Sequence, residues 1–241
     1  MLGIQAAIGA LNDVVDAPLD AIAKPRKPIP TGLVARRVAI AVAGGGALLG
    51  LGLSAGSGVG TLLVGACCLT LGWLYDLRLS RTALSWLPLS IALPLLPIHA
   101  WLGATGLIPG ELVTLVPIGV LAGAGLALAN GIVDVDRDAQ SGRSAVVVAL
   151  GRRRAWILQT AGLALAAGMA LLLAPGAGSA GVLRWGGLGL GCLALAMGAG
   201  ALASSRAGIR ERGWELEAVG VAGLAIGWLA GLAAVLTPNG V

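Results

Sequence analysis

The residues best suited to chemistry are acids and amides that follow one pattern, Asn-x3-Asp-x3-Asp, which occurs twice. Its members are Asn12, Asp16 and Asp20 in the first copy and Asn130, Asp134 and Asp138 in the second. Asp13 and Asp136 add one carboxylate to each copy, so the two copies hold six of the eleven acidic residues. Neither copy contains a histidine or a cysteine. Oxygen donors alone favour a hard cation, and Mg²⁺ is the natural choice.

The spacing within each copy indicates how these side chains can converge. On a helix, a spacing of four places Asp134 and Asp138 one turn apart on one face and puts Asn12 and Asp16 on or near one face. A spacing of three lets Asp13 and Asp16 meet. Two acidic clusters that face each other repel unless cations lie between them. The lysines and arginines near both copies suit a phosphate-bearing anion. We therefore expect a diphosphate bridged by magnesium.

The rest of the chain is strongly apolar. It has 241 residues, of which 57% are hydrophobic and 11% are charged, and its mean hydropathy is +0.93. This composition excludes an ordinary soluble domain and indicates a multi-pass integral membrane protein. The net charge of +5 then reports topology rather than a nucleic-acid partner. A ligand with a charged head and a hydrocarbon tail fits such a chain better than a nucleotide does.

Long apolar runs predict an all-α bundle with seven full transmembrane helices. The expected spans cover residues 38–54, 59–77, 84–103, 110–133, 155–174, 185–203 and 214–236. Residues 1–11 predict about half a span, roughly 16 Å of helix, with Pro18 disrupting or restarting the helix. When alternate loops are assigned to opposite sides, every basic residue except Arg184 falls on the side of the motifs. The positive-inside rule then predicts that both motifs face the cytoplasm.

The motifs and their surroundings resemble those of the UbiA superfamily of intramembrane prenyltransferases. The segment NDVVDAPLDAIAKPRKPIPTG is similar to the first signature of that family, and DVDRDAQSGRS followed by ALG is similar to the second. The resemblance implies a single membrane domain over residues 1–241, with helices around a central cavity and two Mg²⁺ ions. It also implies transfer of a prenyl group from an isoprenyl diphosphate to an aromatic, quinone-precursor, chlorin or lipid acceptor in the membrane.

The resemblance also implies roles for individual residues. Those expected to act in catalysis are Asp13, Asp16, Asp134 and Asp138, and the same four with Asp20 are the expected metal ligands. Those expected to bind the diphosphate, directly or through water, are Asn12, Lys24, Lys27, Arg78, Arg81, Asn130 and Arg143.

This sequence departs from the family pattern in three ways. Lys27 stands where the family usually has arginine, and Ser80 stands where it usually has lysine. The family has nine spans, so seven spans and a half helix imply that the first helix and part of the second are missing. Two alternatives remain open beside the enzyme: a transporter or channel that uses the acidic clusters as cation sites, and an inactive truncated homologue.

Overall fold

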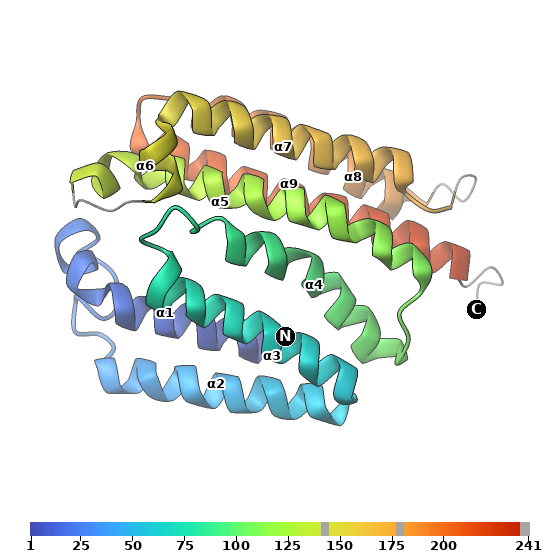
Figure 1. The fold of residues 1–241 in the computed structure, drawn as a ribbon, viewed down its shortest axis with the longest axis horizontal. Helices are drawn as coiled ribbons and strands as arrows, with labels where there is room; N and C mark the ends of the chain where they lie inside the picture. The colour runs from blue at the N-terminus through green and yellow to red at the C-terminus, as the bar shows by residue number, and fades with distance from the viewer. Residues whose placement is uncertain (141–144, 177–180, 237–241) are drawn as a thin grey trace. The chain divides into compact units, whose positions relative to one another are not determined.

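The computed structural model describes residues 1–140, 145–176 and 181–236, and within them it contains helices and no strands (Figure 1). Two short helical segments, a π-helix η1 and a 3₁₀-helix η2, accompany the α-helices. In chain order the elements are α1 (Leu2–Ala23), α2 (Arg36–Gly56), α3 (Val59–Leu74), η1 (Tyr75–Leu79), α4 (Leu87–Thr105), η2 (Gly110–Thr114), α5 (Leu115–Gln140), α6 (Val146–Leu150), α7 (Arg152–Leu173), α8 (Val182–Leu202) and α9 (Ala207–Leu236).

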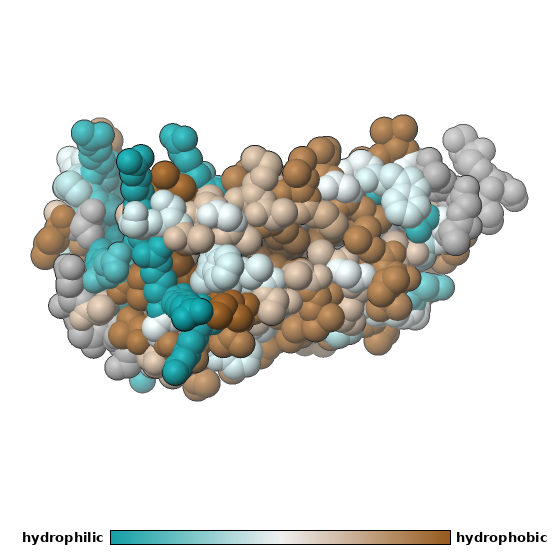
Figure 2. Space-filling view, turned by 90° about the horizontal axis from the view of Figure 1, so that it is seen from above, coloured by the Kyte–Doolittle hydropathy of each residue, from teal (hydrophilic) through white to brown (hydrophobic). Residues whose placement is uncertain are grey.

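The prediction of an all-α membrane protein is confirmed. Seven helical stretches among the described residues are long and apolar enough to cross a membrane. They match the seven predicted spans, and α1 is not among them. Figure 2 views the molecule from the side of α7: hydrophilic residues gather at the end where that helix begins, and hydrophobic residues cover most of the remaining face. An apolar belt of this kind is what a lipid-facing surface requires.

Two predicted boundaries are wrong. α1 does not break at Pro18 but continues to Ala23. The turn after Pro18 is held from both sides, because the Asp20 carbonyl accepts a hydrogen bond from Lys24 N and the Asp20 carboxylate pairs with Lys27. α5 does not end near residue 133 but continues to Gln140, so the second motif is helical throughout. Hydropathy falls where a helix leaves lipid, which does not require the helix to end.

The chain forms two compact units, and unit 1 comprises residues 1–80 and 95–108. In this unit α1 packs against α2 through glycines. A Cβ atom on Gly46 would lie 2.8 Å from the Gly3 carbonyl oxygen, and one on Gly50 would lie 2.8 Å from Ile4 N. The apolar face of α1, including the fully buried Ile4 and Ala7, thereby joins a core with Cys68 and Leu69 of α3. This contact fixes the rotation of the helix that carries the first motif.

Unit 2 comprises residues 81–94 and 109–241. Its closest helix pair is α8 with α9, where glycines on both helices bring the two backbones together. A Cβ atom on Gly191 would lie 2.8 Å from the Gly220 carbonyl oxygen, and one on Gly227 would lie 2.6 Å from the Arg184 carbonyl oxygen. In lipid, helices associate through such close packing rather than through the hydrophobic effect.

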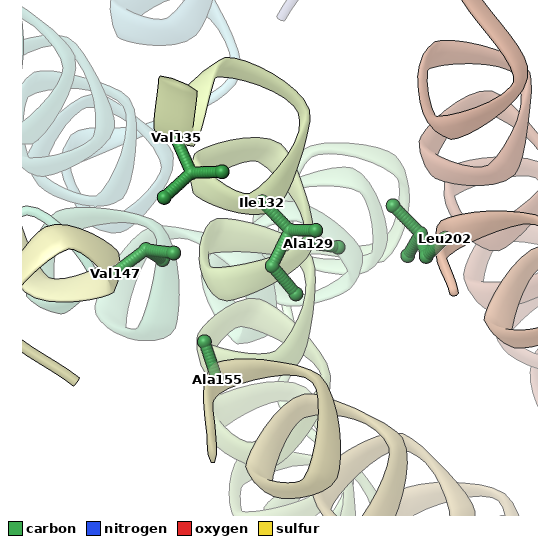
Figure 3. Packing of buried hydrophobic residues seen from close by; sticks show 6 residues of the cluster. All are labelled: Ala129, Ile132, Val135, Val147, Ala155 and Leu202. Atoms are coloured by element: carbon green, nitrogen blue, oxygen red, sulfur yellow. The ribbon is translucent and has the colours of Figure 1, made fainter. Parts of the chain in front are cut away.

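A second core lies in unit 2 beside the second motif. Figure 3 shows that its members project from four helices: Ala129, Ile132 and Val135 from α5, Val147 from α6, Ala155 from α7 and Leu202 from α8. Gly131 permits the close approach of α6, because a Cβ atom there would lie 2.5 Å from Val147 Cγ2. This apolar stripe fixes the rotation of α5 and hence the direction of the polar residues between its members.

Candidate functional site

The first motif lies along the second half of α1 in unit 1. Asn12 and Asp16 are one helical turn apart, and Asn12 Nδ2 lies 3.5 Å from Asp16 Oδ2. Val14, between them in sequence, is buried and faces the core. The expected convergence of Asn12 and Asp16 on one face is therefore observed.

Lys27 joins the two remaining carboxylates of the first motif. Its Nζ lies 2.8 Å from Asp13 Oδ1 and 2.8 Å from Asp20 Oδ2. Backbone hydrogen bonds from Lys27 N to the Lys24 carbonyl and from Thr31 N to the Lys27 carbonyl, each 3.0 Å, shape the loop that presents this ammonium. Burial lowers the pKa of Lys27, but hydrogen bonds and the charges of both aspartates outweigh it, so the pKa is raised above its ordinary value. Lys27 is thus held as a cation between two carboxylates.

Asp76 joins the first motif from outside it and was not among the site residues predicted from the sequence. It lies in the π-helix η1, which extends α3, and its side chain is buried. Its Oδ1 accepts a hydrogen bond from Asn12 Nδ2 at 3.0 Å. A carboxylate directly after Tyr75, at the end of an apolar span, was the only signal in the sequence.

Two other predicted diphosphate contacts, Lys24 and Arg78, also belong to unit 1. Their side chains are exposed, and the ion pairs with Asp13 and Asp20 are formed by Lys27 instead. Arg81 is also exposed and belongs to unit 2. Exposed basic side chains of this kind can pair with an anion from solution.

The second motif lies on the last turns of α5 in unit 2. Asn130, Asp134 and Asp138 share one face of this continuous helix because they are spaced by four. Asp134 forms an ion pair with Arg137, while Asp138 is buried. Arg143, a predicted diphosphate contact, lies outside the described residues.

Arg210 on α9 contacts the helix that carries this motif. The sequence predicts it only as one of the basic loop residues on the side of the motifs. Its Nη2 lies 2.8 Å from Asp136 Oδ2 and 3.4 Å from the Val133 carbonyl oxygen, and its Nη1 donates to the Ser205 carbonyl at 2.8 Å. The Arg210 residue is 1% exposed. It therefore ties the start of α9 to the helix that carries Asp134 and Asp138.

A second buried polar contact lies deeper in unit 2. Glu217 of α9 and Gln159 of α7 are both fully buried. With the Gln159 amide nitrogen turned toward Glu217, it lies 3.2 Å from each carboxylate oxygen, and the amide oxygen accepts from Thr160 Oγ1 at 2.8 Å. Polar pairs inside a helical membrane bundle need such partners. This contact holds α7 to α9.

The donor set in each unit fits magnesium better than a nitrogen- or sulfur-loving metal. Among the described residues, no three histidine, cysteine or carboxylate side chains lie close enough to form a metal site on their own. Mg²⁺ usually takes one or two carboxylates and fills its other positions with water and phosphate oxygens. The Asn12, Asp16 and Asp76 group, with a buried carboxylate oxygen that makes no hydrogen bond among the described residues, offers such a partial set.

Comparison with known proteins assigns the chain to a family. The model of the UbiA prenyltransferase family matches residues 1–214. No curated protein sequence matches the chain. In fold it is similar to the apo structure of a UbiA homolog from Aeropyrum pernix K1, with a TM-score of 0.74, 20% identity, and coverage of 97% of this chain and 86% of the homolog.

A second solved structure is described as digeranylgeranylglyceryl phosphate synthase in membranes. Its TM-score is 0.62 at 15% identity, with coverage of 95% of this chain and 82% of the synthase. Both likenesses concern the fold, and the family match covers most of the sequence, including both aspartate motifs. The chain is a multi-pass membrane protein that belongs to the UbiA prenyltransferase family.

Proposed function

We propose that the protein transfers a prenyl group from an isoprenyl diphosphate to an acceptor in the membrane, that the reaction depends on Mg²⁺, and that residues 1–241 act as one domain. The observation that carries the proposal is the repeated Asn-x3-Asp-x3-Asp motif, present twice in a chain of a prenyltransferase family. The oxygen donors of the motif do not contribute to packing against lipid. Burying charged groups in membrane helices costs free energy, so such residues usually mark a functional site.

In this proposal both motifs serve to bind the diphosphate substrate. Asp13, Asp16, Asp20, Asp134 and Asp138 would hold two Mg²⁺ ions. Bound Mg²⁺ would neutralise the negative charge that develops on the departing diphosphate. The basic residues assist by donating hydrogen bonds to the diphosphate oxygens: Lys24, Lys27, Arg78, Arg81 and Arg143, with the amides of Asn12 and Asn130.

The apolar helices supply the remaining chemistry. They bind the prenyl tail, in which each buried methylene contributes up to about 0.8 kcal/mol, and they keep water away from the allylic cation after the carbon–oxygen bond breaks. An electron-rich acceptor then attacks that cation and releases a proton as the new bond forms. We propose an aromatic, quinone-precursor or lipid acceptor, and a cytoplasmic position for both motifs because the basic residues gather on their side.

The direct test measures diphosphate release by the purified full chain in lipid nanodiscs, with prenyl diphosphates of several lengths and candidate acceptors. We expect release to require Mg²⁺ and to stop when the metal is chelated. Asp16→Asn and Asp134→Asn each remove a proposed metal ligand and are expected to lower turnover by about 100-fold or more, the scale of lost transition-state charge stabilisation.

Glu111→Gln is the matched control, because Glu111 is an exposed acid in η2, outside both motifs. It is expected to retain full activity. Full activity in Asp16→Asn and Asp134→Asn would contradict the metal assignment. Metal-driven ion flux into vesicles without any diphosphate release would contradict the enzyme and favour a transporter.

A further inference from the structure

The feature that the proposed function leaves unexplained is the buried carboxylate of Asp76. The residue is 4% exposed, and it lies outside both aspartate motifs. It sits in η1, where the Ser80 N to Tyr75 carbonyl hydrogen bond of 2.9 Å closes a π-helical turn. Such turns occur often at functional sites. The turn continues α3 and brings Asp76 against α1.

The two carboxylate oxygens of Asp76 have different surroundings. Oδ1 accepts from Asn12 Nδ2 at 3.0 Å. Oδ2 is buried and has no hydrogen-bond partner among the described residues. A buried carboxylate oxygen without a partner is unfavourable, since it has lost water and gained nothing in return. This oxygen therefore needs a partner that the described residues do not supply.

Asp16 makes the arrangement less favourable still. The same Asn12 amide nitrogen lies 3.5 Å from Asp16 Oδ2, so one amide holds the carboxylates of two different helices. Because both carboxylates lie within reach of one amide nitrogen, their negative charges repel each other. Lys27 pairs with Asp13 and Asp20. Within the described residues, no basic side chain forms an ion pair with Asp76.

We propose that Asp76 is a metal ligand of the first motif and shares one divalent cation with Asp16, while the Asn12 amide braces the two carboxylates. A cation would satisfy the orphaned Oδ2 and remove the repulsion. Two carboxylates are the usual protein share for Mg²⁺, whose other positions take water and phosphate. The inference rests on the proposed function and extends it, because it adds a ligand from outside the motif and gives Asn12 a positioning role.

The test uses Mn²⁺ as an oxygen-preferring probe, titrated into the full chain in nanodiscs while the electron paramagnetic resonance signal of the free ion is recorded. An Asp134→Asn background confines the titration to the first motif. In this background Asp76→Asn, which keeps the shape of the side chain, is expected to weaken Mn²⁺ binding by 10-fold or more, an effect of the size seen when metal-site residues are changed.

Thermal unfolding of the metal-free protein separates a ligand from a structural residue. Asp76→Asn is expected to unfold at the same temperature or higher without metal, because it relieves repulsion with Asp16, and to lose most of the rise that Mn²⁺ gives the parent. The control is Thr61→Val. Thr61 lies on α3 and is, like Asp76, a buried polar residue with a side-chain oxygen, Oγ1, that has no hydrogen-bond partner among the described residues. It is expected to leave Mn²⁺ binding unchanged.

Unchanged Mn²⁺ affinity in Asp76→Asn would overturn the inference, whatever the stability of the metal-free variant. The proposed function fails separately. If Asp16→Asn loses Mn²⁺ binding but Asp76→Asn keeps it, only this inference is overturned. If Asp76→Asn weakens Mn²⁺ binding but the wild-type protein releases no diphosphate from any prenyl diphosphate, the site stands and the enzyme assignment falls.

Discussion

Arg210→Ala removes a guanidinium that α9 buries against the helix of the second motif. The charge-assisted hydrogen bond to the Ser205 carbonyl, 2.8 Å long, is worth about 1.5 to 3 kcal/mol. The contact with the Val133 carbonyl is 3.4 Å and adds little. The ion pair with Asp136 involves a side chain that is 69% exposed, so solvent reduces its contribution to about 0 to 1 kcal/mol. We therefore expect Arg210→Ala to lower the free energy of unfolding by about 1.5 to 4 kcal/mol.

The assay is equilibrium unfolding in mixed micelles, with increasing denaturing detergent and far-ultraviolet circular dichroism as the signal. Asp136→Asn is expected to cost less than about 1 kcal/mol, because its partner keeps the backbone carbonyls. Arg212→Ala, an exposed arginine of the same helix, is the control and is expected to stay within about 0.5 kcal/mol of wild type. If Asp136→Asn destabilised the protein as much as Arg210→Ala, the ion pair would dominate and the reasoning from exposure would be refuted.

Three further substitutions test the packing and the charges. Gly191→Ala is expected to lower the free energy of unfolding by about 1 to 3 kcal/mol in the same assay, because its Cβ would meet the backbone of α9. The control is Gly189→Ala, where nothing lies within 4 Å, and it is expected to raise that free energy by up to about 1 kcal/mol. Equal effects of the two substitutions would contradict the contact. Gln159→Leu is expected to lower the free energy of unfolding by about 1 to 3 kcal/mol, because Glu217 loses its amide donor. Adding Glu217→Leu to this variant is expected to restore most of the lost stability. If the double variant recovered nothing, the pairing would be refuted. Lys27→Met is expected to enlarge the rise in melting temperature that Mg²⁺ gives, because the ammonium no longer occupies the carboxylates of Asp13 and Asp20. The rise given by inorganic diphosphate is expected to shrink. An unchanged effect of Mg²⁺ would contradict competition between Lys27 and the metal.

The membrane architecture could be predicted from the sequence because the bilayer sets span length and penalises charge, so hydropathy alone located seven spans. Residue spacing likewise predicted that Asn12 and Asp16 share one face, because both lie on one helix. The end of α5 could not be predicted in the same way. Hydropathy reports contact with lipid, and the helix continues through Asp134 and Asp138 after that contact ends.

The contacts that join distant segments were beyond local patterns. Asn12 meets Asp76 across 64 residues, and Arg210 meets Asp136 across 74. No periodicity links such positions, because each pairing depends on how helices pack. Asp76 in particular could not be recognised from its neighbours in the sequence. A single carboxylate at the end of a span has the same sequence context as an ordinary solvated residue at a membrane boundary. Only the packing of α1 against η1 gives it a partner and a buried oxygen.

The glycine contacts between α8 and α9 have a consequence for the behaviour of the protein in the cold. Hydrophobic association weakens on cooling, because it depends on the ordering of water around apolar surface. The two backbones meet inside lipid, where dispersion between touching atoms holds them and water has no part. We therefore expect this helix pair to keep its cohesion at temperatures at which contacts formed in water lose theirs.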